Sequence, residues 1–256
     1  MTKNNTKELL EKIEGKQFTS DRFHILTNNK RLETPNIKGI PQSWIKIHFK
    51  TYPRLDKIKV LTKSKISDLS NIIKKRKSVR SFSGRKISQN QIFHLLLGSC
   101  GLIKEGKDIN QSRRPYPSAG ARYPLEVYAI ILNCKEIKKG LYHYNVKENS
   151  LELLLEENLN KWLIETTGGE KWIANAGVVF IITGVLDRTR IKYGDRGYRY
   201  TLIEAGHVGQ NICLLATELG LGCCSLGGFI DYKVNNLLDI DLQKEVSLYL
   251  IAIGRI

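Results

Sequence analysis

The stretch from Arg113 to Tyr128 reads RRPYPSAGARYPLEVY and holds three of the chain's six prolines. It passes directly into the apolar run 127–132, VYAIIL. Proline fixes φ and offers no N–H, whereas glycine adopts backbone angles that other residues resist. We therefore expect a shaped loop that leads into a buried strand, where backbone can approach a ligand closely. The alternative is an ordinary surface loop that is rich in proline.

Further apolar runs downstream predict the other strands of a sheet. Residues 140–145 and 151–155 flank a polar turn, as the strands of a β-hairpin do. Residues 176–185 are continuously apolar and rich in β-branched side chains, which predicts a central strand buried on both faces. Shorter runs at 223–229 and 246–253 predict a strand that enters a glycine turn and a last strand.

Amphipathic segments predict helices between these strands. A helical pattern begins near Ser67, and Ser88 is the expected N-cap of a second helix that ends near Gly101. Further helices are expected over residues 161–167, 198–219 and 232–238. Together these elements predict an α+β fold in which helices flank a mostly antiparallel sheet.

The longest predicted helix, residues 198–219, carries small residues along one stripe. Ala205, Gly206 and Gly209 stand where a core helix would usually place leucine. Small side chains let another helix approach closely. We therefore expect this face to pack against a partner helix, for which a second subunit is one source.

Bulk composition places the chain among ordinary globular proteins. Its 256 residues are 41% hydrophobic and 26% charged, which excludes a wholly disordered chain. No apolar run is long enough to cross a bilayer, and the N-terminus does not read as a signal peptide, so a cytoplasmic protein is predicted. Five cysteines without a CxxC or a Cys/His set predict buried free thiols, with neither disulfides nor a metal site.

Positive charge is concentrated in the first third of the chain. Residues 1–90 contain 22 lysines and arginines against 7 acidic residues, whereas residues 91–256 contain 19 against 18. Such a charge can steer acidic partners or substrates. No nucleic-acid-binding motif accompanies it, so nucleic-acid binding is not favoured.

Residues 1–66 have too few apolar side chains for a core of their own. They are predicted to be a basic arm that wraps over a main domain of residues 67–256. Within the arm, residues 7–13 are weakly helical, and the alternating run 44–49 is typical of an edge strand. Apart from that short run, residues 21–66 show no sustained period.

Two segments carry groups suited to a phosphorylated heterocycle. Arg76, Lys77, Ser78 and Arg80 offer guanidinium, ammonium and hydroxyl donors within five residues, the set that a phosphate monoester needs. The turn 225–228 offers backbone N–H groups that can face a flat ring. Each signal is weak alone, because basic runs usually face solvent and glycines often end strands.

The order of these motifs resembles that of the FMN-dependent nitroreductase superfamily. RKSVR precedes a helix, PSAGARYPLEV precedes a strand, and GHVGQN on the long helix is followed by LGGF. The resemblance covers residues 67–256. Within the superfamily the chain looks most like the azoline dehydrogenases of the streptolysin S and microcin type. That closer match rests on segments 114–121, 123–127, 142–144 and 192–193, with 23–24 and 50–53 in the arm.

The resemblance implies an activity, a cofactor and partners. Such enzymes oxidise thiazoline and oxazoline rings of a modified peptide to thiazoles and oxazoles. It implies FMN, a homodimer, an azoline-containing precursor peptide made on the ribosome and cyclodehydratase partner proteins. The cofactor-binding residues that it implies are Arg76, Lys77, Ser78, Arg80 and Arg255 for the phosphate and ribityl groups, Pro117, Ser118 and Gly120 from the partner subunit, and Ser225, Leu226, Gly227 and Gly228 behind the ring.

One departure from ordinary nitroreductases bears on the reaction. Those enzymes commonly place Asn and Gln side chains of the proline-serine loop against the flavin, whereas this chain has Ala121 and Tyr123 there. The departure favours azoline oxidation. An NAD(P)H-dependent nitro or quinone reductase and a non-catalytic scaffold subunit of a peptide-modifying complex are the alternatives.

Lys192 and Tyr193 match the lysine-tyrosine pair to which catalysis is attributed in the resembling enzymes. Aromatising an azoline needs a base for the proton on the ring carbon that bears the peptide carbonyl, while the flavin takes a hydride. A Tyr193 phenolate beside the Lys192 cation suits that role. Adjacent side chains diverge on regular backbone, so we expect irregular structure over residues 191–194. The alternative is a solvated lysine beside a packing tyrosine.

Three further residues are secondary candidates for the site. Tyr198 and Arg199 follow the lysine-tyrosine pair closely in the sequence. His207 is expected to pack within the long helix rather than to act as a base.

Overall fold

The computed structural model describes residues 18–32, 50, 54–59, 67–103 and 112–256. The predicted helix at 7–13 and the predicted edge strand at 44–49 lie outside these residues. Within them, six strands form one sheet in the order β3-β2-β1-β4-β6-β5, and every neighbouring pair is antiparallel. The strands are β1 (Leu125–Ile131), β2 (Gly140–Asn145), β3 (Ser150–Leu155), β4 (Val178–Val185), β5 (Gly222–Leu226) and β6 (Glu245–Gly254). The predicted α+β class and antiparallel sheet are confirmed.

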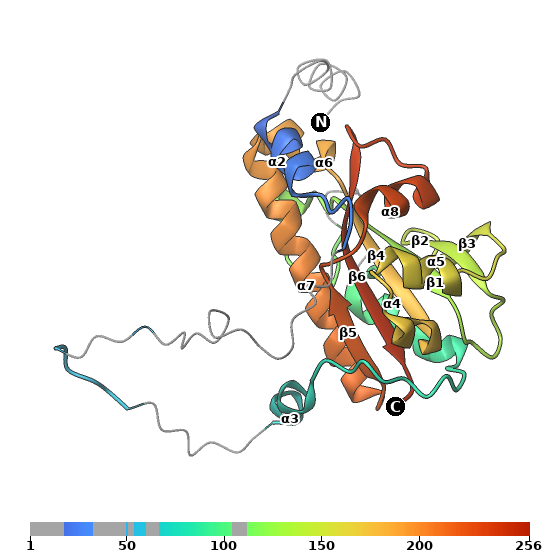
Figure 1. Ribbon diagram of the computed structural model, residues 1–256. Helices are drawn as coiled ribbons and strands as arrows, with labels where there is room; N and C mark the ends of the chain where they lie inside the picture. Colours follow the sequence, from blue (N-terminus) through green and yellow to red (C-terminus); the bar gives the residue numbers. More distant parts are fainter. Residues whose placement is uncertain (1–17, 33–49, 51–53, 60–66, 104–111) are drawn as a thin grey trace, which may run out of the picture.

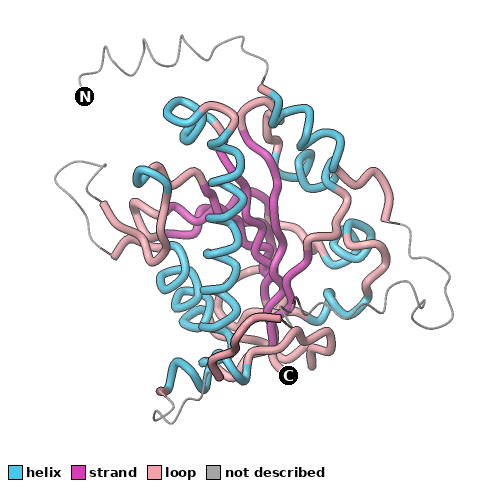
Figure 2. Tube along the Cα trace, turned by 90° about the vertical axis from the view of Figure 1, so that its left-hand side faces the viewer, coloured by secondary structure: helices cyan, strands magenta, loops and turns pink. Residues whose placement is uncertain are grey.

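Helices cover both faces of the sheet (Figures 1 and 2). On one face, α4 and α7 pack against a cluster of buried side chains, and on the other face α5 and α8 pack against a second cluster. The helices are α2 (Thr19–Thr27), α3 (Asp68–Lys75), α4 (Gln89–Cys100), α5 (Asn160–Thr166), α6 (Asp187–Tyr193), α7 (Arg196–Glu218) and α8 (Asp231–Leu238), with short 3-10 turns at Ala119–Ala121 and Lys171–Asn175.

Strand β4 is the centre of the sheet, as its apolar sequence predicts. It pairs with β1 on one side and β6 on the other, and seven of its eight residues are buried. Alternate side chains point to opposite faces. Phe180 therefore joins the cluster under α4 and α7, whereas Ile181 joins the cluster under α5 and α8.

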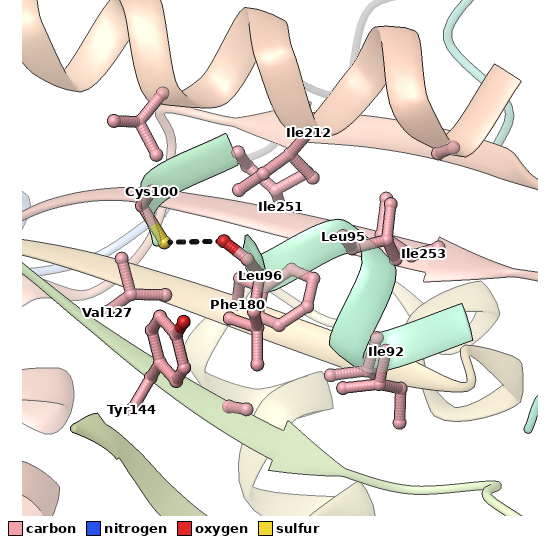
Figure 3. Close-up of a cluster of buried hydrophobic side chains, with 14 of the residues drawn as sticks. Ile92, Leu95, Leu96, Cys100, Val127, Tyr144, Phe180, Ile212, Ile251 and Ile253 are labelled. Carbon is pink, nitrogen blue, oxygen red and sulfur yellow. Dashed lines mark hydrogen bonds between the residues drawn. The ribbon is translucent and has the colours of Figure 1, made fainter. Parts of the chain in front are cut away.

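Figure 3 shows part of the first cluster, in which side chains of α4 and α7 meet side chains of β1, β2, β4 and β6. Phe180 of β4 shares this cluster with Leu96 of α4 and Ile212 of α7, and it is wholly buried. The thiol of Cys100 donates to the Leu96 carbonyl at 3.3 Å. All five cysteines are buried and free, which confirms the prediction.

Serine side chains begin α3 and α4. The Ser67 hydroxyl accepts the Ser70 amide at 3.2 Å. Ser88 and Gln91 form a reciprocal capping box, with bonds of 3.3 and 3.1 Å. Because a capping side chain satisfies an amide that has no partner within the helix, these residues place both helix starts where the sequence predicts them.

The arm contains a helix that the sequence pattern does not predict. Helix α2 spans Thr19–Thr27, and Ser20 and His24 are its buried residues. It packs beside α6 and the N-terminal end of α7 (Figure 1). The division of the chain at residue 66 stays a prediction.

Most of the small-residue face of α7 packs against the protomer's own sheet. For that part of the face, the prediction that it packs against a partner helix is wrong. A Cβ at Gly209 would lie 2.8 Å from the Tyr249 ring of β6. Ala205 is also buried there. Gly206 instead faces outward, and a Cβ there would meet nothing within 4 Å.

We predict opposite effects for alanine at these two glycines. Gly206→Ala should stabilise the protein by roughly 0.5–1 kcal/mol, because alanine is the better helix former and the position is open. Gly209→Ala should destabilise it by about 1 kcal/mol, because overpacking against Tyr249 outweighs that gain. Urea unfolding of both variants at concentrations that keep the chain monomeric measures the difference. Equal effects would contradict this account of how α7 packs.

Candidate functional site

The loop before β1 has an unusual backbone. Gly120, Ala121 and Tyr123 have φ values of +61°, +53° and +45°. Such angles suit glycine but strain residues that carry a Cβ. Strained backbone persists only where its surroundings hold it, and it clusters at functional sites. The loop is therefore shaped, as its prolines and glycine predict.

Hydrogen bonds from within the loop and from α7 hold this conformation. The Tyr123 amide donates to the Ser118 hydroxyl at 2.8 Å. One oxygen of Glu204 accepts the Ala119 amide at 3.0 Å, and the Asn211 side chain donates to the Pro115 carbonyl at 3.3 Å. Helix α7 thus supports the loop at two levels.

Helix α6 is hydrogen-bonded to the same loop through Arg188. The Arg188 guanidinium donates to the Tyr123 carbonyl at 3.2 Å, and the Arg188 carbonyl accepts the Arg122 guanidinium at 2.6 Å. Arg188 also pairs with Glu126 at 2.5 Å, and Glu126 reaches His143 at 3.1 Å. Burial opposes the Glu126 charge, but hydrogen bonds from His143 and Arg188 lower its pKa. The motif residues Glu126 and His143 therefore tie the strands to α6.

Lys192 and Tyr193 converge on Gly120. A Cβ at Gly120 would lie 2.6 Å from the Tyr193 hydroxyl and 3.0 Å from the Lys192 ammonium. The ammonium lies 5.3 Å from the centre of the Tyr193 ring, and that ring packs nearly perpendicular to the Tyr200 ring. The structure thus brings both predicted catalytic side chains to one point of the predicted cofactor loop.

The prediction of irregular backbone over residues 191–194 is wrong in its main part. Helix α6 runs through Tyr193 and ends at Gly194, which has a φ of +56°. The two side chains leave a helix about 100° apart, but both are long enough to reach Gly120 from its last turn.

The predicted phosphate-binding run lies beside β5. The Val79 amide donates to the Cys223 carbonyl at 2.8 Å, which fixes the run along this edge strand. Lys77, Ser78 and Arg80 are exposed. Within the described part of the chain, no ion pair involves the cations of this run.

The glycine turn after β5 is also open. Gly227 and Gly228 are exposed, and a Cβ at Gly227 would meet nothing within 4 Å. The Ser225 hydroxyl lies 3.4 Å from the Cys213 thiol of α7. Arg255 follows β6 and donates to the Lys86 carbonyl at 2.8 Å, so part of its guanidinium is already engaged.

The predicted site residues therefore form two groups within one protomer. The first, around β5, contains the basic run, Ser225–Gly228 and Arg255, and the second contains Pro117, Ser118 and Gly120 with the lysine-tyrosine pair. The two groups lie beside different turns of α7 (Figure 1). Ala119 of the second group contacts Glu204, whereas Ser225 of the first group contacts Cys213. Nine residues of helix separate those turns by about 14 Å.

Glu204 is a site residue that the sequence analysis missed. Only 2% of it is exposed, and its Oε2 has no hydrogen-bond partner among the described residues. Burial raises the pKa of Glu204 to about 7, although the Ala119 amide, Ser118 and Arg114 oppose the shift. A glutamate on the small-residue face of a core helix was the available signal.

The secondary candidates have different surroundings. Tyr198 is buried and shares a 2.9 Å hydrogen bond with His24 of α2. Arg199 and His207 are exposed, so the predicted packing role of His207 is wrong.

The described residues contain no cluster of three or more His, Cys, Asp or Glu side chains arranged to hold a metal ion. Their helices include none that is long and apolar enough to span a membrane.

Comparison with known proteins identifies the family. Residues 73–255 match the sequence profile of the nitroreductase family. The chain belongs to that family.

Individual relatives refine this placement. A Methanocaldococcus jannaschii protein named for the nitroreductases is 36% identical over 73% of this chain and 90% of its own length. The microcin B17-processing protein McbC of Escherichia coli is 31% identical over 55% of this chain, a match that spans only 53% of McbC. A chain of the E. coli microcin synthetase McbBCD complex with truncated pro-MccB17 bound has the same fold, with a TM-score of 0.72 at 24% identity, covering 98% of this chain and 94% of that one.

The buried carboxyl of Glu204 predicts a pH-dependent difference in stability. Its pKa is raised in the folded state, so folding favours the protonated form and wild-type stability falls as pH rises from about 4.5 to about 7. Glu204→Gln keeps an acceptor for Ala119 without the charge. It should gain stability over wild type across that range, by up to about 3 kcal/mol at pH 8.

Urea unfolding between pH 4 and pH 8 measures this difference. Glu157→Gln, at an exposed position with no ion pair among the described residues, is the control and should leave the pH profile unchanged. A difference between Glu204→Gln and wild type that stays constant with pH would show that Glu204 ionises normally in the folded protein.

Proposed function

We propose that this protein is an FMN-dependent dehydrogenase that oxidises thiazoline or oxazoline rings in a ribosomally made precursor peptide to thiazoles or oxazoles. The observation that carries the proposal is the convergence of Lys192 and Tyr193 on Gly120. Family membership and the likeness to a microcin-processing protein support it.

The residues around β5 fit the phosphate end of FMN. Arg76, Lys77 and Arg80 supply cationic donors that are free of carboxylates among the described residues, and Ser78 adds a hydroxyl. A phosphate needs such a set. The open glycine turn 227–228 leaves room for a flat ring to lie against backbone. Ser225 and Leu226 precede that turn, and Arg255 offers its remaining guanidinium donors.

The chain's own residues would handle the proton. FMN, when bound, supplies the oxidation by accepting a hydride. Tyr193 is the proposed base for the proton on the ring carbon that bears the peptide carbonyl, with the Lys192 ammonium beside its ring. Gly120 leaves the space in which both groups meet the substrate, because any side chain there would collide with them.

A homodimer would complete the site. The outer face of α7 exposes Leu202 and Ile203, which are 40% and 51% accessible, beside the open Gly206. We propose that a second copy packs on this face and that Pro117, Ser118 and Gly120 line the FMN bound by the partner subunit. Cyclodehydratase proteins, which make the azoline rings, are the further partners proposed.

An NAD(P)H-dependent nitro or quinone reductase is the second candidate. The 36% identity to the M. jannaschii protein favours it, because that match covers 90% of a protein named for nitroreductases. Rapid bleaching of the flavin by NAD(P)H, followed by turnover of a nitroaromatic compound, would support this candidate against azoline oxidation. Colourless protein that still binds peptide-modifying partners would instead support a scaffold.

Substitution of the lysine-tyrosine pair tests the proposed reaction. Lys192→Ala and Tyr193→Phe should each retain bound flavin but lower the rate of azoline oxidation by roughly 100-fold or more, as expected for loss of a general base. The visible spectrum reports the flavin, and the mass of a thiazoline-containing peptide, 2 Da lighter for each ring oxidised, reports the reaction.

Tyr232→Phe is the control, because Tyr232 is exposed and lies on α8. Full activity in both Lys192→Ala and Tyr193→Phe would remove the catalytic assignment.

A second prediction separates backbone strain from contact with the pair. Gly120→Ala and Gly220→Ala both place a Cβ at positive φ, +61° and +67°, and each should cost about 1–2 kcal/mol of stability. Only at Gly120 does the Cβ meet Lys192 and Tyr193, whereas at Gly220 it meets nothing within 4 Å. Azoline oxidation should therefore fall in Gly120→Ala alone. Parallel losses of activity in the two variants would argue against the pair as the site of reaction.

A further inference from the structure

Helix α2 of the arm contacts both ends of the helical turn that carries Lys192 and Tyr193. The buried Ser20 makes both contacts. Its amide donates to the Asp195 carboxylate at 2.9 Å, two residues after Tyr193. Its hydroxyl accepts from the Arg190 guanidinium at 3.0 Å, two residues before Lys192.

Of the two residues that Ser20 contacts, Arg190 is the more deeply buried. Only 2% of it is exposed, although it carries a full charge. It pairs with Asp21, lies 4.8 Å over the ring of Phe18 and donates to the Gln243 carbonyl at 3.4 Å. A buried guanidinium is costly unless it is paired and hydrogen-bonded. Most of its partners come from the arm, so α2 is what makes this burial tolerable.

A backbone hydrogen bond connects Arg190 to the turn that carries Lys192 and Tyr193. The Arg190 carbonyl accepts the Gly194 amide at 2.8 Å, and this bond closes the last turn of α6 around Lys192 and Tyr193. Hydrogen bonds from Ser20 lower the pKa of Asp195, so its carboxylate is charged where it meets α2. Both ends of the turn are therefore tied to the same serine.

A second contact fixes α2 farther along its length. His24 shares a hydrogen bond of 2.9 Å with Tyr198 on the first turn of α7. The rings of Phe23 and the same tyrosine pack in a T-shaped arrangement, with centroids 6.1 Å apart. Because α2 is attached at two points one helical turn apart, it cannot pivot about Ser20.

We propose that Ser20 and Asp21 are positioning residues for catalysis, which hold the turn of Lys192 and Tyr193 in register with Gly120. The inference rests on the proposed function, because it assigns these residues to the same reaction. It gives the arm a role inside the enzyme. A displacement of about 1 Å in a catalytic group can cost on the order of 100-fold in rate, so a rigid support two residues away matters.

Ser20→Ala tests the proposal in the FMN-loaded protein of 256 residues. It removes the hydroxyl that Arg190 uses and keeps the amide that Asp195 uses. The kcat for oxidation of a thiazoline-containing peptide should fall by about tenfold or more, with KM and flavin content within about twofold of wild type. Asp21→Asn, which removes the charge opposite Arg190, should give the same pattern.

Leu26→Ala is the matched control, because Leu26 lies on the same helix and is 72% exposed. Its kcat should equal that of wild type. The proposal is overturned if Ser20→Ala and Asp21→Asn match Leu26→Ala, or if their loss of kcat is accompanied by an equal loss of flavin.

Hydrogen exchange separates this inference from the proposed function. The Gly194 amide closes the clamped turn, so its exchange should quicken by about tenfold or more in Ser20→Ala and remain unchanged in Leu26→Ala. If wild type does not oxidise azolines but the exchange changes as expected, the proposed function fails while the clamp stands. Unchanged exchange in Ser20→Ala overturns the clamp whatever the reaction.

Discussion

The close packing of α7 on β6 is the constraint on which both halves of the candidate site depend. A Cβ at Gly209 would lie 2.8 Å from the Tyr249 ring, so glycine sets how near the helix comes to the sheet. From that distance Glu204 reaches the Ala119 amide, and Cys213 reaches Ser225. Hydrogen bonds are lost within about half an ångström of extra length. A larger side chain at position 209 would push α7 away from β6 and would break its hydrogen bonds to the loop and to the β5 turn together.

The loop before β1 shows why a site can be located from sequence but not shaped from it. Its prolines and Gly120 predict a bend near a ligand, and the bend is present. Positive φ at Ala121 and Tyr123 is not predictable from those residues, because both disfavour it. That conformation is imposed by bonds from Glu204 and Arg188, which are 60 or more positions away in the chain. Tertiary contacts outweigh local preference there.

Elements with strong local signals were predictable, and those held by distant contacts were not. The strand β4 is determined by its own apolar residues and the start of α4 by the side chain of Ser88, so both are predictable from the local sequence. Helix α2 has a weak pattern and is held by Arg190 and Asp195, about 170 residues later, so it was missed. Glu204 was missed for a related reason, because an acidic residue is not expected among the buried positions of a helix.

The outward face of α7 connects the division of the site to the proposed dimer. Within one protomer, about 14 Å of helix separates the level of α7 that contacts the Ala119 loop from the level that contacts Ser225. Gly206 lies between the levels of Glu204 and Cys213 on the exposed side, with Leu202 and Ile203 beside it. In the proposed dimer, a second copy packed there would bury this apolar surface. Gly206, which has no side chain, would then let the two α7 helices approach closely.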